Sequence, residues 1–404
     1  MKTKTIRKVL EYILVVCIIL EFNTTYCIFP IIKRTIQILP IIILLLLILL
    51  NKRKAPKICG YIIIYMMGSI FPLFVLKNDL YLAYCFRFII TLPLLWIYLG
   101  QRKEIHTNAY ILLPLRLSNV IVLFAFISII MWLFCSIIEV IPQTSVFPYE
   151  WNPNVPFIPS YYNLYFETQQ VNLFGLQLWR NSGIFNEAPV HNMILCTALA
   201  IEYFIRPQKS KLRLSILILA IISTLTTTGQ LFIIAIGGWH IYKKIGKTYR
   251  PLLILVTPII LVILYLTSNM IIESKLESGG QGSVDLRSED IEYCLEVGMQ
   301  NPIMGVGIIP SENDMTWRGE QIGRSNSIFT VFARGGIYML TLYLGALVII
   351  PLLYLRKNKN SNWSMMMICY FGLFTITIAY LNLLTLLFIA WGLSNIDMKN
   401  VIKI

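Results

Sequence analysis

Residues 36–50 read Ile36-Gln-Ile-Leu-Pro-Ile-Ile-Ile-Leu-Leu-Leu-Leu-Ile-Leu-Leu50, and the basic stretch Lys52-Arg53-Lys54 follows almost at once. An apolar run closed by positive charge is typical of a helix that crosses a membrane and ends on the cytoplasmic side. Similar runs recur from one end of the chain to the other. This stretch therefore predicts the fold class, an all-α polytopic membrane protein.

The composition of the 404 residues agrees with this fold class. Hydrophobic residues make up 57% and charged residues 13%, whereas a soluble globular protein is nearer half apolar and a quarter charged. A soluble enzyme, a secreted disulfide scaffold and a disordered chain are excluded. The eight cysteines form no CxxC pair and no cluster with histidine, and we expect them to be buried apolar residues.

The apolar segments predict about twelve membrane-spanning helices, since each span needs roughly 20 apolar residues. They lie at residues 9–30, 36–50, 58–76, 80–99, 112–138, 189–205, 214–227, 230–242, 251–268, 326–352, 364–378 and 381–394. The first is interpreted as an uncleaved helix, because no cleavage site follows it.

The distribution of positive charge predicts the topology. With a cytoplasmic N-terminus, most of the 34 Lys and Arg residues fall in connections on the cytoplasmic side, as the positive-inside rule requires. We therefore predict a single integral domain over residues 1–404, multi-pass in the cytoplasmic (inner) membrane, with both termini cytoplasmic. The net charge of +14 then reflects topology and contact with anionic membrane lipid, and not nucleic acid.

Two long segments interrupt the apolar pattern, at residues 139–188 and 269–325, and both are predicted to be outer-face loops. The first is rich in proline and aromatic residues. These side chains fit a belt at the membrane interface, flat faces for sugar rings, or both. The second is acidic overall and contains a flexible stretch at 277–283, followed by a short helix near 284–299.

The end of the first outer segment carries the strongest candidate site. Pro189 can begin a helix, which places Glu187 at the positive end of the helix dipole. His191, four residues on, shares a face with Glu187 and is the only histidine predicted on the outer side. Two interpretations stay open: a helix cap with an interfacial histidine, or a functional group of charged side chains together with Arg180 at the water–membrane boundary.

The second outer segment offers a turn and further arginines. Its predicted helix carries Arg287 and ends at Asn301-Pro302. Gly305 and Gly307 follow, and glycine permits a sharp turn and close backbone approach. Arg334 lies about two turns inside the next span, so we expect it to face the protein interior or a water-filled cavity.

Four arginines are thus predicted near the outer boundary: Arg180, Arg287, Arg324 and Arg334. The guanidinium fork binds phosphate oxygens bidentately and stays charged when it is partly desolvated. This arrangement suits a lipid-linked diphosphate. The alternative is that each arginine pairs with one of the acidic residues nearby.

Four pieces of sequence, in this order, form a familiar pattern. They are Arg180 with Gly183-Ile-Phe-Asn-Glu187-Ala-Pro189, the turn Leu225–Gln230, Arg287 with Asn301-Pro-Ile-Met-Gly305-Val-Gly307, and Ser325-Asn326-Ser327 before a span with Gly335-Gly336. In these motifs the chain resembles the bacterial O-antigen and capsular polysaccharide polymerases and the related O-antigen ligases. The motifs cover about residues 175–345, and the pattern of spans extends the resemblance over the rest.

The chain departs from that family at two points. The family's Glu-Pro-Gly is Glu187-Ala188-Pro189 here, shifted by one residue. The usual His-Asn before the last motif is Ser325-Asn326. Because the ligases tend to need that histidine, its absence favours a polymerase.

The resemblance implies a GT-C-like fold and a metal-independent glycosyltransferase without cofactors. Its substrate is an undecaprenyl-diphosphate-linked oligosaccharide, and its partners are a flippase and a chain-length regulator. It assigns catalytic roles to Glu187, His191, Arg180 and Arg287, and binding of diphosphate or glycan to Arg324, Asn326, Arg334, Gly305 and Gly307. The alternatives are an O-antigen ligase, a lipid-linked oligosaccharide flippase or transporter, and an outer-face sensor or assembly protein.

Overall fold

The structure is a computed structural model. It describes residues 2–51, 56–75, 84–105, 109–148, 157–173, 175–244, 281–306, 316–317, 320–321, 326–357 and 361–395. The chain forms two compact units, which we describe separately. Unit 1 comprises Met1–Val120, Ile201–Gln208 and Leu286–Ile404, and unit 2 comprises Ile121–Ala200 and Lys209–Asp285.

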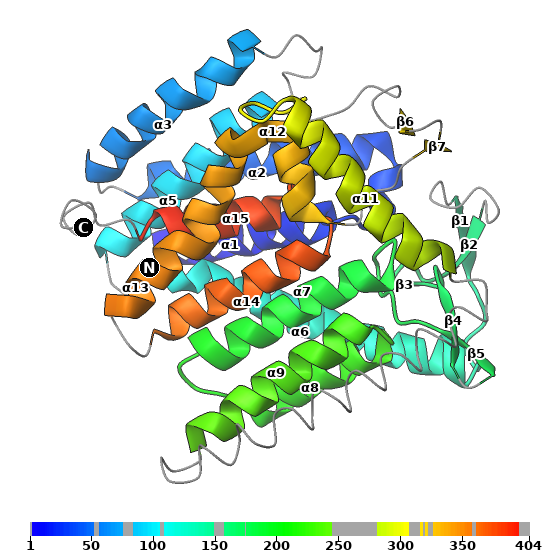
Figure 1. Cartoon of the computed structure of the whole chain (residues 1–404). Helices are drawn as coiled ribbons and strands as arrows, with labels where there is room; N and C mark the ends of the chain where they lie inside the picture. The colour runs from blue at the N-terminus through cyan, green and yellow to red at the C-terminus, as the bar shows by residue number, and fades with distance from the viewer. Residues whose placement is uncertain are drawn as a thin grey trace. The chain divides into compact units, whose positions relative to one another are not determined.

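Unit 1 is almost entirely helical (Figure 1). Its first elements are α1 (Lys2–Glu21), η1 (Thr25–Ile28), α2 (Pro30–Leu50), α3 (Pro56–Val75), the π-helix η2 (Cys85–Thr91), α5 (Leu92–Ile105), η3 (Ala109–Ile111) and the start of α6 (Leu112–Met131). The later elements are η5 (Ile201–Ile205), most of α11 (Gln281–Gln300), β6 (Thr316–Trp317), β7 (Glu320–Gln321), α12 (Ser327–Leu344), the π-helix η9 (Gly345–Ile349), α13 (Ile350–Lys357), α14 (Asn362–Ile376) and α15 (Leu383–Leu393).

The core of unit 1 is built around α15. Every residue from Leu383 to Leu393 is buried, because this helix is apolar on all sides and a helix of that kind belongs in an interior. It packs against α5, α1, α14 and η9, and Figure 1 shows it, in red, among these helices. At Gly392 the backbone of α15 approaches the carbonyl of Ala346 so closely that a Cβ atom would overlap it.

Unit 2 combines helices with short strands. Its helical elements are the rest of α6, the π-helix η4 (Trp132–Ile137), α7 (Ala188–Ala200), α8 (Lys211–Ser223) and α9 (Thr227–Lys244). Its strands are β1 (Ser145–Pro148), β2 (Phe157–Tyr161), β3 (Tyr165–Phe166), β4 (Gln170–Leu173) and β5 (Leu176–Trp179). Helices α7, α8 and α9, in green in Figure 1, lie side by side.

The strands form two small antiparallel sheets. Strands β1, β2 and β3 pair in that order, with Ser145 opposite Ser160 and Tyr161 opposite Tyr165. Strands β4 and β5 form a hairpin with Gln170 opposite Trp179. These strands lie in the segment 139–188, which was predicted as a loop. The prediction of an all-helical chain was therefore wrong for this segment, where a β-structured insertion replaces the loop.

The helical prediction is confirmed elsewhere. The predicted apolar segments within the described residues are helical, including the two tight hairpins, which are α8–α9 and α14–α15. The exception is the first, 9–30, in which α1 already ends at Glu21 and the short helix η1 leads into α2. The predicted span at 251–268 lies outside the described residues. Helix α11 begins at Gln281, so the stretch predicted as flexible is already helical over residues 281–283.

In the part of the chain that the structure describes, four helical stretches are long and apolar enough to cross a membrane: Pro30–Leu50, Leu112–Ile137, Ala188–Ile205 and Ser327–Lys357. Such stretches indicate a membrane protein. They differ in burial, since 89% of the Ala188–Ile205 window is buried but only 28% of the Pro30–Leu50 window. Most of the apolar surface of Pro30–Leu50 therefore faces outward within the described structure, as is expected of a helix that contacts lipid.

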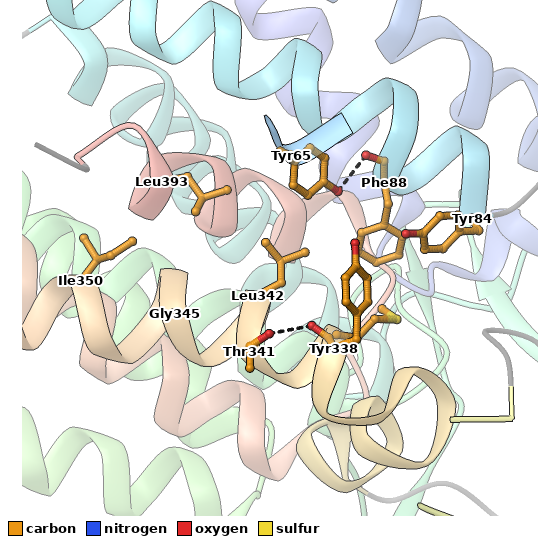
Figure 2. Close-up of a pocket in the computed structure, with 10 residues that line it drawn as sticks. Tyr65, Tyr84, Phe88, Tyr338, Thr341, Leu342, Gly345, Ile350 and Leu393 are labelled. Carbon is orange, nitrogen blue, oxygen red and sulfur yellow. Dashed lines mark hydrogen bonds between the residues drawn. The ribbon is translucent and has the colours of Figure 1, made fainter. Parts of the chain in front are cut away.

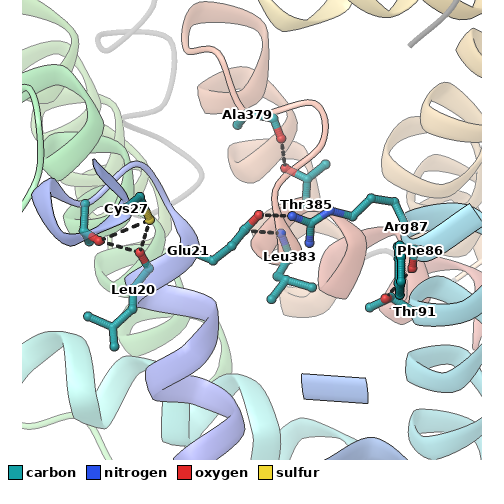
Figure 3. A network of polar contacts seen from close by, with 10 residues as sticks. Leu20, Glu21, Cys27, Phe86, Arg87, Thr91, Ala379, Leu383 and Thr385 are labelled. Carbon is teal, nitrogen blue, oxygen red and sulfur yellow. Dashed lines mark hydrogen bonds and ion pairs between the residues drawn. The ribbon is translucent and has the colours of Figure 1, made fainter. Parts of the chain in front are cut away.

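Largely buried ion pairs join helices of unit 1. Arg87 in η2 pairs with Glu21 at the end of α1, and the second carboxylate oxygen of Glu21 accepts from the backbone N–H of Leu383, 2.9 Å away. Figure 3 shows this network. Arg116 pairs with Glu11 in the same unit. Both arginines fall inside predicted spans, 80–99 and 112–138. Their charges are neutralised because burying an unpaired charge is costly.

Candidate functional site

The segment 180–188 of unit 2 is a tight turn organised by Asn181. The side-chain amide of Asn181 donates to the hydroxyl of Ser223, 2.8 Å away, and its oxygen accepts from the N–H of Gly183 at 3.1 Å. Its backbone N–H donates to the carbonyl of Ser223 at 3.0 Å. Asn181 is fully buried, so these bonds satisfy groups that would otherwise be costly to bury.

His191 lies directly beneath this turn. Its imidazole is 2% exposed, its Nδ1 lies 3.1 Å from the carbonyl oxygen of Asn181, and it stacks on Phe185 with ring centroids 5.1 Å apart. Gly183 has φ +56, and a Cβ there would lie 3.0 Å from the ring. The imidazole therefore supports the turn from inside. His191 is an interior residue with a structural contact, and it does not lie at the interface as the first interpretation supposed.

Arg180 is half-buried, and its guanidinium bonds to Thr224 and Gln169. Its Nε donates to the carbonyl of Thr224 at 3.1 Å, and a terminal nitrogen lies 3.3 Å from the side-chain oxygen of Gln169. The same oxygen of Gln169 accepts from the N–H of Ala188, in the first turn of α7, at 3.3 Å. Thr224 begins the turn between α8 and α9. The structure therefore brings the motif that runs from Arg180 to Pro189 together with the turn Leu225–Gln230.

Glu187 stands immediately before α7, as predicted. Its side chain is half-buried, and its carbonyl accepts from the N–H of His191 at 3.2 Å. A carboxylate at this position is stabilised by the helix dipole. Among the predicted catalytic residues, Glu187 and Arg180 are partly open to solvent, and His191 is not.

The turn after α11 in unit 1 inserts into a break in α12. Helix α12 loses its helical geometry at Gly336, where φ is +57 and ψ is −161. The N–H groups freed there donate to the turn: Ile337 N–H to the carbonyl of Pro302 at 2.8 Å, and Tyr338 N–H to that of Ile303 at 3.1 Å. Val306 N–H in turn donates to Ala333 at 3.0 Å.

Two glycines make this insertion possible. A Cβ atom at Gly305, which has φ +67, would overlap the backbone of Arg334, and one at Gly336 would overlap the backbone of Ile303. Neither obstacle is a movable side chain. The predicted close backbone approach at Gly305 is thus confirmed, and its partner is the protein's own helix.

Arg334 occupies the last turn before the break and is 5% exposed. This confirms that it faces the protein interior. Asn326 caps α12, since its side-chain oxygen accepts from the N–H groups of Ile328 and Phe329 at 2.9 and 3.3 Å. Arg287 lies on α11, but its side chain is not among those described, and Arg324 and Gly307 lie outside the described residues.

A buried carboxyl that the sequence did not reveal lies in the β-structured segment. Glu167, 5% exposed, accepts from the hydroxyls of Ser136 at 2.6 Å and Tyr161 at 3.1 Å. Burial raises the pKa of this carboxyl above its usual value of 4.5, with a smaller contribution from Glu139, against the lowering effect of the two hydrogen bonds. No charge or spacing signal singles out Glu167, because only the fold brings Ser136 to it.

Within the described ranges, no group of three His, Cys, Asp or Glu side chains is arranged to hold a metal ion. The metal-independent reaction stays a prediction. No protein-family model, curated protein or solved structure matches this chain.

Proposed function

We propose that this protein is a polysaccharide polymerase, a metal-independent glycosyltransferase of the cytoplasmic membrane with about twelve spans, a GT-C-like architecture and both termini in the cytoplasm. It transfers a growing glycan from its undecaprenyl diphosphate carrier onto a lipid-linked repeat unit at the outer face. The acceptor hydroxyl oxygen bonds to the anomeric carbon, and the bond from that carbon to the diphosphate oxygen breaks. The diphosphate leaves on the lipid carrier.

The observation that carries the proposal is the broken helix α12 with buried Arg334 beside the break. Non-helical backbone at membrane depth is tolerated only where protein or a water-filled cavity surrounds it. An arginine within such a stretch marks a functional site by default. The inserted turn, Pro302 to Gly305, supplies the backbone partners that this arrangement needs.

The remaining roles follow from the chemistry of the step. The departing diphosphate gains negative charge, which a guanidinium stabilises most strongly in a dry site. We assign this role to Arg334 and Arg180, with Arg287 and Arg324. The acceptor hydroxyl loses a proton, and Glu187, half-buried at the start of α7, is the carboxylate that we assign as its base. His191 positions the turn that carries both Arg180 and Glu187.

The test is polymer synthesis in proteoliposomes that contain undecaprenyl-diphosphate-linked repeat units. Arg334→Lys should lower the rate about a hundred- to a thousand-fold, as for the loss of one contact to developing charge, whereas Arg356→Lys should not, because Arg356 is exposed at the far end of the same helical stretch. Glu187→Gln should abolish polymer at normal protein level, since a cap alone contributes only about 1 kcal/mol.

Two results would end the proposal. One is wild-type protein that makes no polymer but transfers glycan to a terminal acceptor, which would identify a ligase. The other is wild-type protein that moves the lipid-linked unit across the bilayer without elongating it. The second result would favour a flippase. The broken helix α12 is also compatible with a flippase, because discontinuous helices line the sites of many transporters.

A further inference from the structure

Unit 1 contains a pocket that the proposed transfer reaction does not use. It has a volume of about 330 Å³ and lies between α3, η2, α12, η9, α13 and α15. Figure 2 shows aromatic rings gathered at one end, those of Tyr65, Tyr84, Phe88 and Tyr338, and Leu342, Ile350 and Leu393 at the other. The walls are therefore almost wholly aromatic and aliphatic.

The polar atoms in the walls already have partners within the protein. The hydroxyl of Tyr65 donates to the carbonyl of Phe88 at 2.9 Å, and that of Tyr84 donates to the carbonyl of Ser69 at 3.1 Å. The hydroxyl of Thr341 donates to the carbonyl of Tyr338 at 2.8 Å. Each of these three hydroxyls has already donated its hydrogen, and most of the wall is apolar. A polar ligand would therefore lose more hydrogen bonds to water than it could replace here, so the pocket favours an apolar ligand.

The position of the pocket along α12 and η9 places it among hydrocarbon. Its residues from Tyr338 to Ile350 occupy the middle of the stretch Ser327–Lys357, which has 31 residues. The part after the break at Gly336, residues 337–357, alone spans about 30 Å at about 1.5 Å per residue, which matches a hydrocarbon core of about 30 Å. Leu342, Gly345 and Ile350 therefore lie at the depth of the lipid chains. Two π-helical segments, η2 and η9, contribute Phe88 and Gly345, and such segments often occur at functional sites.

We propose that this pocket binds the acyl chain of a membrane phospholipid, near the methyl end of the chain. Its volume is roughly twice that of an engineered apolar cavity of about 150 Å³ that stays dry and binds benzene. Acyl chains are the apolar ligand that a bilayer supplies at the highest concentration at this depth, and occupancy follows concentration. The bound chain fills the space between α3 and α12 and stabilises unit 1. This inference rests on the membrane location alone and not on glycan transfer.

The experiment uses full-length protein in vesicles of phosphatidylethanolamine and phosphatidylglycerol, with a fraction of the phosphatidylglycerol carrying a photoreactive diazirine at the methyl end of one acyl chain. After illumination, labelled residues are mapped by mass spectrometry. Gly345→Leu is the test variant, because Gly345 lines the pocket and a Cβ there meets no atom within 4 Å. Gly372→Leu in α14 is its matched control, since a Cβ at Gly372 is equally free and Gly372 does not line the pocket.

We expect Tyr65 and Leu342 to be labelled in the wild type and in Gly372→Leu. In Gly345→Leu their labelling should fall about tenfold, which corresponds to a loss of about 1.4 kcal/mol in binding. Ile349, 52% exposed, serves as the lipid-facing reference and should be labelled equally in all three proteins. Leu342→Ala enlarges the pocket, so Tyr65 should still be labelled in this variant. A loss of label in Gly345→Leu alone would then be due to filling of the pocket.

Three outcomes would overturn the proposal. The first is no label on Tyr65 or Leu342 in the wild type. The second is equal label on these residues in Gly345→Leu and Gly372→Leu. The third comes from a parallel experiment with a diazirine-bearing polyprenyl phosphate: if this lipid labels the pocket and the phospholipid does not, the occupant is an isoprenoid chain.

Discussion

Gly336 and Gly305 are the residues on which the insertion of the turn into α12 depends. The φ of +57 and ψ of −161 at Gly336 belong to a region that is essentially restricted to glycine, and other residues held there cost about 1–3 kcal/mol. The overlap of an added Cβ with the Ile303 backbone adds to this. A larger side chain at either glycine would force the turn out of the break and leave the N–H groups of Ile337 and Tyr338 without acceptors.

Gly336→Ala should therefore lower the free energy of unfolding by several kcal/mol, the sum of backbone strain and the lost hydrogen bonds. The measurement is thermal or denaturant unfolding of purified protein. Gly372→Ala is the matched control, since a Cβ at Gly372 meets nothing and alanine is favoured over glycine within a helix by about 0.5–1 kcal/mol. Equal stability of the two variants would contradict the role of the break.

Glu167 predicts a pH dependence. Because its pKa is raised in the folded protein, the protonated form is favoured there, and folding takes up protons as the pH rises above 4.5. The contribution of Glu167 to the free energy of unfolding is fully present below pH 4.5 and is lost as the pH rises through the pKa of the folded protein. The stability of the wild type relative to Glu167→Gln should therefore fall over this window and then level off.

The measurement is unfolding of both proteins between pH 4 and pH 8. Glu292→Gln is the control, because Glu292 is exposed on α11 and should follow the wild-type curve. A constant difference between the wild type and Glu167→Gln across the range would show that Glu167 titrates normally. The stable partner of Ser136 would then be a carboxylate.

At the scale of elements, Glu21 ties three helical segments of unit 1 together. It ends α1, pairs with Arg87 of η2 and accepts from the first N–H of α15 (Figure 3). A buried pair adds little stability over an apolar pair, but breaking it leaves an uncompensated charge that costs about 3–5 kcal/mol. The pair therefore matters more for which helices meet than for how strongly they are held.

Glu21→Gln should destabilise unit 1 by about 3–5 kcal/mol because Arg87 keeps its buried charge. Adding Arg87→Met should restore most of the loss, since the double variant has no charge left at either position and the new amide oxygen would still accept from the N–H of Leu383. Thermal unfolding of the single and double variants measures this coupling. If adding Arg87→Met to the Glu21→Gln protein lowered its stability further, the charges of the two residues would not be energetically coupled.

The whole molecule shows which features a sequence reveals. Helices were predicted because each one is an apolar run long enough to be recognised by itself, and the turn at Gly305 because glycine and proline mark turns. The sheets of segment 139–188 were missed, since their strands have two to five residues and prolines interrupt the alternation that marks a strand.

The site was predicted less completely than the fold. Arg180, Glu187 and Arg334 stood out by charge. The structure holds Glu187 where α7 begins, Arg334 beside the break in α12, and Arg180 in the turn after β5. Asn181 and Gln169, which fix the turn, are uncharged amides whose partners lie 42 and 19 residues away. The break in α12 was missed although Gly335-Gly336 was noticed, because two glycines permit a break and only the inserted turn imposes it.

The topology of the whole chain is the last prediction. The distribution of Lys and Arg places positions near 160 and 310 outside and a position near 209 inside. Alkaline phosphatase, which is active only outside, should therefore be active when fused near 160 or 310 and inactive near 209. An inactive fusion near 310 with an active one near 209 would reverse the orientation and remove the proposed site from the outer face.

The bond between Glu21 and Leu383 also sets an order of events during synthesis. The two residues are 362 positions apart, and ribosomes add about 5–20 residues per second, so Glu21 leaves the ribosome tens of seconds before its partner exists. Throughout that interval α1 and η2 lack the helix around which unit 1 is packed. A nascent chain that stalls before α15 therefore presents an unfinished core to the insertion machinery and to membrane proteases, whereas unit 2, which ends at Asp285, has by then been synthesised in full.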